Sequence, residues 1–223
     1  MNRELFEYDP QTHTGTYKGK PIPSVTQLVD ILYPMSKDIP QERITKAAER
    51  GTMIHELIEM INTHFDTPLP FDMVMKELIK MVCELTNKDG KKELVDYVSL
   101  INAYKLRPFD FEELIFLLDE QGEPICFGHY DLTAMPQEDN ILFTEGKLNL
   151  FDYKTTSLFD KKKVSLQESI YAYAYEQCSG NPIENIYGIW LTETPRIIPL
   201  KKHDKTYVVE LCKGLAKIWY DRR

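Results

Sequence analysis

The hydrophobic pattern of this chain changes its period near residue 107, and this change limits the fold more than any other feature. Before that point, apolar residues recur at helical spacing with almost no strand signal, which predicts helices over residues 25–32, 41–64 and 71–106, the last broken at residues 87–90. After it, strands are expected over residues 111–118, 125–134, 148–154, 186–191 and 196–200, and helices over residues 161–178 and 207–220. This order predicts a mixed sheet flanked by helices, an α/β or α+β core with a helical N-terminal elaboration.

The length suits a single domain with a real hydrophobic core. Of the 223 residues, 43% are hydrophobic, and we expect one domain in which residues 1–106 are the mainly helical part and residues 107–223 the sheet-containing part. No apolar run reaches the roughly 18 residues of a membrane span. The polar, acidic start does not resemble a secretory signal. We therefore expect an intracellular protein that does not enter the membrane.

The cysteines and the net charge exclude few functions. The four cysteines are scattered without a C-x-x-C pair, which argues against a zinc knuckle or an iron–sulfur site and fits reduced thiols in the cytoplasm. The net charge of −8 argues mildly against a nonspecific polyanion binder. It allows an enzyme that gathers carboxylates around metal ions and meets DNA through a local basic patch.

Two charged side chains stand out in the expected strand 148–154. Side chains alternate across a strand, so Asp152 and Lys154 share one face, whereas Tyr153 lies on the other. An edge strand with a charged outer face would show the same pattern. Asp131, however, interrupts the preceding strand, and an acid in mid-strand is costly unless it is exposed or paired. Two such acids on successive strands suggest a shared Mg²⁺ or Mn²⁺ ion, since both ions prefer oxygen ligands.

Two carboxylates and a lysine suit the hydrolysis of a phosphodiester bond. A metal can bind the scissile phosphate and lower the pKa of a bound water. The lysine can orient or deprotonate that water and offset the charge of the pentavalent state.

Two helices add further polar candidates. His55 lies among apolar positions of the helix 41–64, where a histidine is either a core residue or a metal ligand. Gly51 interrupts the same helix and marks a break or a close approach. Gln167 and Tyr171 share one face of the helix 161–178 and suit contact with a phosphate or a metal-bound carboxylate, although a tyrosine-rich packing surface is the simpler alternative.

Taken in chain order, these elements resemble the RecB-like branch of the PD-(D/E)XK nuclease superfamily. That branch has the ordered motifs G-x-x-x-H, G-x-x-D, D-x-K and Q-x-x-x-Y. The chain has them as Gly51 to His55, Gly128 to Asp131, Asp152 to Lys154 and Gln167 to Tyr171. Each motif alone is weak, but the four occur in order, and the resemblance covers about residues 24–191, which is most of the chain.

The resemblance implies a restriction-endonuclease-like fold, with a central mixed sheet between helices. Asp131 and Asp152 would bind one or two Mg²⁺ or Mn²⁺ ions, helped by His55 and the backbone carbonyl of Tyr153. Lys154 would be the catalytic lysine. Gln167 and Tyr171 would shape the nucleic-acid side of the site. An upstream glutamate would complete the site, and Glu113 is the first choice for it, followed by Glu112.

The chain departs from the family pattern at two places. Its second acid is Asp152 rather than the glutamate common in the wider superfamily, although aspartate is normal in this branch. The C-terminal cysteine group of members with an iron–sulfur cluster is missing, so we expect no cluster. No G-x-x-x-x-G-K-[ST] signature occurs, so any motor or recombination partner would be a separate chain. A homo-oligomer stays open.

The expected function is therefore that of a metal-dependent deoxyribonuclease used in phage or mobile-element recombination and DNA processing. An exonuclease is favoured over an endonuclease. The alternative from another class is a catalytically idle nuclease fold that binds nucleic acid or protein. A run of three lysines leads into the helix that carries Gln167: Lys161, Lys162 and Lys163. This run is either a phosphate clamp beside the metals or a solvated charged loop.

Overall fold

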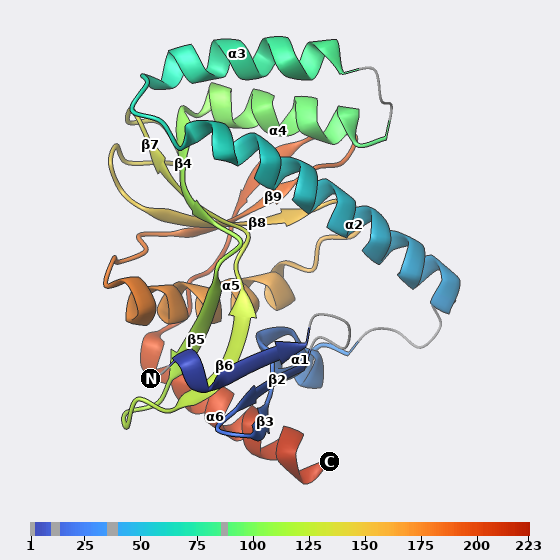
Figure 1. Ribbon diagram of the computed structural model, residues 1–223, viewed down its shortest axis with the longest axis vertical. Helices are drawn as coiled ribbons and strands as arrows, with labels where there is room; N and C mark the ends of the chain where they lie inside the picture. Colours follow the sequence, from blue (N-terminus) through green and yellow to red (C-terminus); the bar gives the residue numbers. More distant parts are fainter. Residues whose placement is uncertain (1–2, 10–13, 35–39, 86–88) are drawn as a thin grey trace.

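The computed structural model describes residues 3–9, 14–34, 40–85 and 89–223. It is an α/β structure built around a five-stranded sheet, in which the strand order is β10-β9-β8-β7-β4 (Figure 1). The strands of this sheet are β4 (Leu106–Phe111), β7 (Leu132–Pro136), β8 (Asn149–Lys154), β9 (Ile186–Trp190) and β10 (Arg196–Pro199). The sheet is mixed because β8 and β9 run parallel, whereas the other neighbours are antiparallel.

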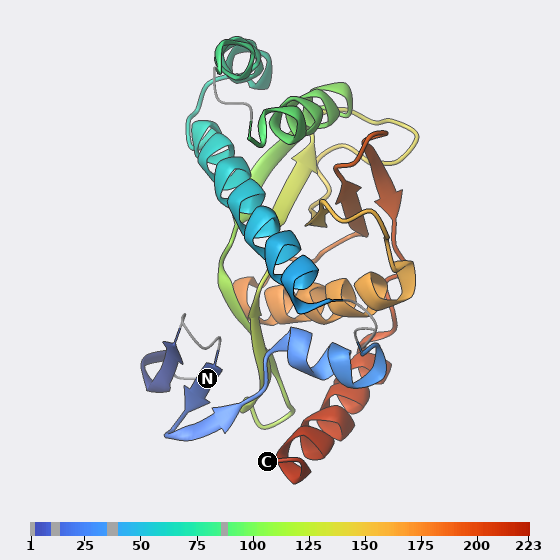
Figure 2. The same ribbon diagram turned by 90° about the vertical axis from the view of Figure 1, so that its right-hand side faces the viewer.

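Helices cover both faces of the sheet, as Figures 1 and 2 show from two sides. On one face lie α2 (Gln41–Asn62), α3 (Phe71–Glu84) and α4 (Lys91–Ala103), and the side chains of Phe151 and Tyr153 pack against this layer. On the other lies α5 (Lys161–Ser179), with α1 (Val25–Leu32) and α6 (Lys205–Asp221) packed against α5, and Leu150 belongs to the core of this layer. The alternation expected along β8 is therefore confirmed. No described helix is long and apolar enough to cross a membrane.

Several helix boundaries agree with the hydrophobic pattern. Ser24 caps α1 with a capping box, in which its side chain and that of Gln27 each accept a backbone N–H of the other residue. The break between α3 and α4 is confirmed by the ends of the two helices, although residues 86–88 of the expected break lie outside the described residues. Gly51 does not break α2, which runs through it as one helix.

The sequence predicts an extended start over residues 1–23 with turns at His13–Gly15 and Lys18–Gly19, and in the described part of this segment the chain forms paired strands. The strands β1 (Phe6–Asp9), β2 (Thr14–Tyr17) and β3 (Lys20–Ile22) form a small antiparallel sheet. They have only three or four residues each and carry polar side chains, so their alternation is too short to stand out. The extended backbone and the turn at Lys18–Gly19 are therefore confirmed, whereas the pairing of these strands into a sheet was not predicted.

The expected strand 125–134 is two strands that belong to different sheets. Its first part is β6 (Pro124–His129), which forms a hairpin with β5 (Leu114–Leu118), and its second part is β7 of the central sheet. The partner strand shows the same division, because β4 ends at Phe111 and β5 begins at Leu114. Both strand pairs thus leave the central sheet at the same level, and Glu112 and Asp131 lie at this level. There the Glu112 N–H donates to the Asp131 carbonyl oxygen at 3.3 Å.

Candidate metal centre

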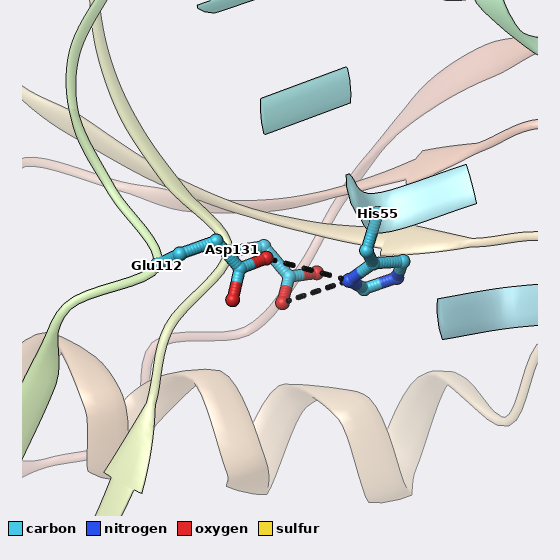
Figure 3. Close-up of side chains that lie close together, drawn as sticks. All are labelled: His55, Glu112 and Asp131. Carbon is cyan, nitrogen blue, oxygen red and sulfur yellow. Dashed lines mark ion pairs between the residues drawn. The ribbon is translucent and has the colours of Figure 1, made fainter. Parts of the chain in front are cut away.

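A histidine and two carboxylates converge at the bend between the two sheets (Figure 3). One ligand atom of each of His55, Glu112 and Asp131 lies within 4.8 Å of the others. Nδ1 of His55 is 3.5 Å from Asp131 Oδ1 and 3.6 Å from Glu112 Oε1. One imidazole nitrogen and two carboxylate oxygens are donors that suit Mn²⁺, and the carboxylates suit Mg²⁺.

The backbone explains why these three residues meet. Glu112 adopts a left-handed conformation, with φ of 52°, which is uncommon for a residue other than glycine and turns the chain from β4 into β5. Asp131 directly precedes β7, and its Oδ2 accepts the backbone N–H of Tyr153 at 2.6 Å. His55 comes from α2 and packs edge-on against the Tyr153 ring.

Asp152 and Lys154 lie beside this cluster on β8. Lys154 Nζ donates to Asp152 Oδ1 at 2.5 Å, as expected for residues on one face of the strand. Asp152 is only 2% exposed, and its second oxygen has no hydrogen-bond partner among the described residues. A buried carboxylate oxygen without a partner is costly, so this atom calls for a proton or a cation.

Glu168 is a further buried acid at the same place, and sequence reasoning missed it. It lies on α5, is 1% exposed, and neither of its carboxylate oxygens has a hydrogen-bond partner in the described part of the chain. The charges of Asp152 and Asp131 raise the pKa of the Glu168 carboxyl, so Glu168 lies on the side of α5 that faces these two acids. The signal in the sequence was weak, because Glu168 stands next to Gln167, the residue that fits the motif.

The pKa values show how crowded with negative charge the site is. Burial alone would lower the pKa of His55, but the carboxylates of Asp131 and Glu112 outweigh it and raise that pKa to about 9. Burial raises the pKa of Asp152 to about 6, although Lys154 opposes the shift. Burial, reinforced by Asp152 and Asp131, also raises the pKa of Glu168 well above its ordinary value. Without a metal, the protonated imidazole of His55 therefore offsets part of this negative charge at neutral pH.

The structure brings Glu112, not the preferred Glu113, into the cluster. Glu113 lines a separate cavity of about 360 Å³ together with Tyr175 and Cys178. The two glutamates are adjacent, so their side chains point in different directions. The sequence could not choose between them, because the choice depends on which of the two adopts the left-handed turn.

The motif on α5 contributes differently from what was expected. Tyr171 is buried and packs on Gly128 of β6, where an added Cβ would lie 2.7 Å from the tyrosine ring. The glycine of the second motif is thus needed for this packing. The Tyr171 side chain also lines a cleft of about 460 Å³, whereas Gln167 is half-buried. The packing alternative for Tyr171 is confirmed, and its contact with a substrate stays a prediction.

The remaining predicted residues divide into two groups. Tyr153 meets the cluster through its N–H, and the role of its carbonyl as a ligand stays a prediction. Lys163 forms an ion pair with Asp30 at 2.7 Å, and its contact with a phosphate stays a prediction. Lys161 and Lys162 are exposed, and neither forms an ion pair with any described residue.

Comparison with known proteins does not add a family to this picture. No family model matches the chain, and no curated protein matches its sequence. The functional argument therefore rests on the motifs and on the geometry that surrounds them.

Proposed function

We propose that this protein is a Mg²⁺- or Mn²⁺-dependent deoxyribonuclease with a restriction-endonuclease-like core. One observation carries the proposal: acids from four separate segments meet beside one lysine, and buried oxygens of Asp152 and Glu168 have no hydrogen-bond partner in the described structure. A structural ion-pair network would pair these atoms. A site that receives a divalent cation needs them unpaired.

The donor set indicates how the residues divide the work. His55, Glu112 and Asp131 would hold the cation, with Asp152 reaching it from β8. The cation, when bound, would polarise the scissile phosphate and lower the pKa of a water. Asp131 is fixed by the Tyr153 N–H, so its oxygens are held in place before any cation arrives.

Lys154 acts in its charged form. Burial would lower its pKa, but Asp152 and Asp131 more than offset this and raise it, so the side chain is an ammonium at neutral pH. Its role is then to donate to a phosphate oxygen and to offset the negative charge of the pentavalent state. Deprotonation of the attacking water by Lys154, which the sequence left open, is the less favoured role.

A cleavage assay tests the proposal. Linear duplex, closed circular and single-stranded DNA are incubated with the protein in Mg²⁺, Mn²⁺ or EDTA. We expect metal-dependent loss of linear DNA only, which marks an exonuclease, and about 100-fold or greater loss of rate in Lys154→Ala and Asp152→Ala. Lys217→Ala, an exposed lysine of α6, is the matched control and should keep the wild-type rate.

Two other outcomes would change the conclusion. Nicking of closed circles would make the protein an endonuclease. If no DNA is cut with either metal, the catalytic proposal is wrong and the idle binding fold becomes the better account. The DNA partner, a separate recombination chain and an intracellular location are parts of the same proposal.

A further inference from the structure

The loop between β8 and α5 carries an exposed apolar side chain on a fixed backbone. Leu158 is 84% exposed. On one side, the carbonyl oxygen of Thr156 accepts the Trp190 Nε1–H at 2.7 Å, and the Thr156 hydroxyl donates to the Leu158 carbonyl oxygen at 2.8 Å. On the other, the Asp160 side chain caps α5. Leu158 is thus held in solvent four residues after Lys154, rather than left there by a loose loop.

Aromatic rings support this loop from the sheet. Phe159 packs on Gly188, where a side chain would collide with its ring, and its centroid lies 5.7 Å from that of Trp190. The guanidinium carbon of Arg196 lies 4.6 Å from the Trp190 centroid. This arrangement holds the flat guanidinium group against a ring while its outer face stays exposed.

The strand register connects this surface to the catalytic pair. Lys154 pairs with Trp190 across β8 and β9, and Trp190 pairs with Arg196 across β9 and β10. Side chains that pair across neighbouring strands lie on the same face, so the three form one row. Leu158 and Arg196 are therefore continuous with Lys154, and we define these two residues with their supports Phe159 and Trp190 as the loop surface.

The charge around the loop surface is locally positive, although the whole chain carries a net charge of −8. Lys161 and Lys162 begin α5 directly after the loop and are exposed. Neither they nor Arg196 form an ion pair with any residue that the structure describes. Cations without protein partners, gathered beside an exposed apolar side chain, complement phosphates next to accessible bases.

We infer that the loop surface binds the unpaired bases of a single-stranded DNA end, with Leu158 and the Arg196 guanidinium stacking on bases and Lys161 and Lys162 contacting phosphates. This inference rests on the proposed nuclease function and adds its substrate class. An apolar wedge and a guanidinium plane gain contact only with bases that are unstacked or unpaired. A blunt duplex hides those faces and can use the cations alone, so the surface favours a single strand or an overhang.

Equilibrium binding of the full chain tests this inference. Fluorescence anisotropy is measured with a labelled oligothymidylate of about 12 nucleotides and with a blunt hairpin duplex, in EDTA, which removes the metal that cleavage needs. The variants are Leu158→Ser and Arg196→Gln. Ile141→Ser is the matched control, because Ile141 is 95% exposed on the loop between β7 and β8 and takes no part in the loop surface.

We expect Leu158→Ser to weaken oligothymidylate binding about tenfold and hairpin binding less than about twofold, since stacking is lost but phosphate contacts remain. Arg196→Gln should weaken the oligothymidylate by a similar factor and lower its salt slope by about one. Ile141→Ser should bind both probes as the wild type does. If Leu158→Ser binds oligothymidylate as tightly as the wild type does, the inference is wrong. It is also wrong if the wild type does not bind oligothymidylate.

The two proposals fail separately. If the wild type cleaves DNA but Leu158→Ser binds single strands as the wild type does, the nuclease proposal stands and the inference about the loop surface is wrong. If the wild type binds oligothymidylate through Leu158 but cuts no DNA with Mg²⁺ or Mn²⁺, the nuclease proposal is wrong. The loop surface then stands as a single-strand binding site. Because Leu158 is exposed, its replacement should leave the thermal unfolding curve unchanged, which serves as the folding check.

Discussion

Replacing Glu168 by glutamine should stabilise the metal-free protein increasingly as the pH rises. Burial raises the pKa of the Glu168 carboxyl well above its ordinary value in the folded chain, whereas in the unfolded chain it returns to about 4.3. Above that pH the unfolded state loses a proton that the folded state keeps. Stability therefore falls as the pH rises, by about 1.4 kcal/mol for each pH unit, until the folded-state pKa is reached. Glutamine has no proton to lose.

The expected size follows from this slope. Between pH 5 and pH 7, the difference in unfolding free energy between Glu168→Gln and the wild type should grow with pH, at most by about 1.4 kcal/mol for each pH unit. Any fixed cost of a buried amide without partners shifts the whole curve but not its dependence on pH. Asp152, with a pKa of about 6, contributes a slope of the same sign in both proteins and cancels in the difference.

Urea unfolding in EDTA at pH 5, 6 and 7 provides the measurement, with Glu184→Gln, an exposed glutamate, as the matched control. Parallel curves for wild type and Glu168→Gln would refute the claim that Glu168 is buried without a partner. In Mg²⁺ or Mn²⁺, the wild type should gain more stability than the variant, since its carboxylate then faces a cation instead of a proton. An equal gain would exclude Glu168 from the metal site.

Further outcomes follow from individual residues. Gly51→Ala should stabilise the protein by about 0.5–1 kcal/mol, seen as a higher Tm, because Gly51 lies inside a helix and nothing lies within 4 Å of an added Cβ. Gly128→Ala should lower the stability by about 1–3 kcal/mol, since its Cβ would meet a buried ring of α5. Mn²⁺ binding at pH 7 should release about one proton from His55, whose pKa of about 9 falls when it becomes a ligand; calorimetry in buffers of different ionisation enthalpy measures this. Glu112→Gln should weaken Mn²⁺ binding about tenfold or more, and Glu113→Gln should not change it.

The His55 shift also affects stability, and the stability that it contributes likewise falls as the pH rises. Its folded-state pKa is raised from 6.5 to about 9, so the charged imidazole contributes stability that is fully present below pH 6.5. That contribution is lost as the pH rises through about 9. In EDTA, the stability of the wild type should therefore fall across this range more steeply than that of His55→Gln.

The main elements of the core could be predicted because their patterns are local. Asp152 and Lys154 lie on one face of β8 as strand alternation requires, and the Ser24 cap follows from a short motif. His55 and Asp131 were found through spacing within single elements. None of these inferences depended on how distant segments pack.

The parts that could not be predicted depend on tertiary structure. The division of residues 124–136 into β6 and β7 requires β4 and β5 to bend at the same level, and a strand pattern contains no sign of this. The choice of Glu112 depends on one left-handed residue. The burial of Glu168 depends on how α5 lies on the sheet, because a helical acid is ordinarily exposed.

These unpredicted features explain one another. The bend in the two strand pairs carries Glu112 and Asp131 out of the regular ladder and toward His55, and α5 covers the site with Glu168. The result is four acids beside one imidazole and one ammonium, with several oxygens that no described group satisfies. Folding alone does not require such an arrangement, since apolar side chains would stabilise the same bend at lower cost. A divalent cation accounts for it, because it stabilises the acids when bound, whereas in its absence buried oxygens of Asp152 and Glu168 lack a partner among the described residues. The loop surface follows the strand that carries Lys154 and joins it through the row Lys154, Trp190 and Arg196, so the residues proposed to hold the DNA end lie in register with the proposed catalytic lysine.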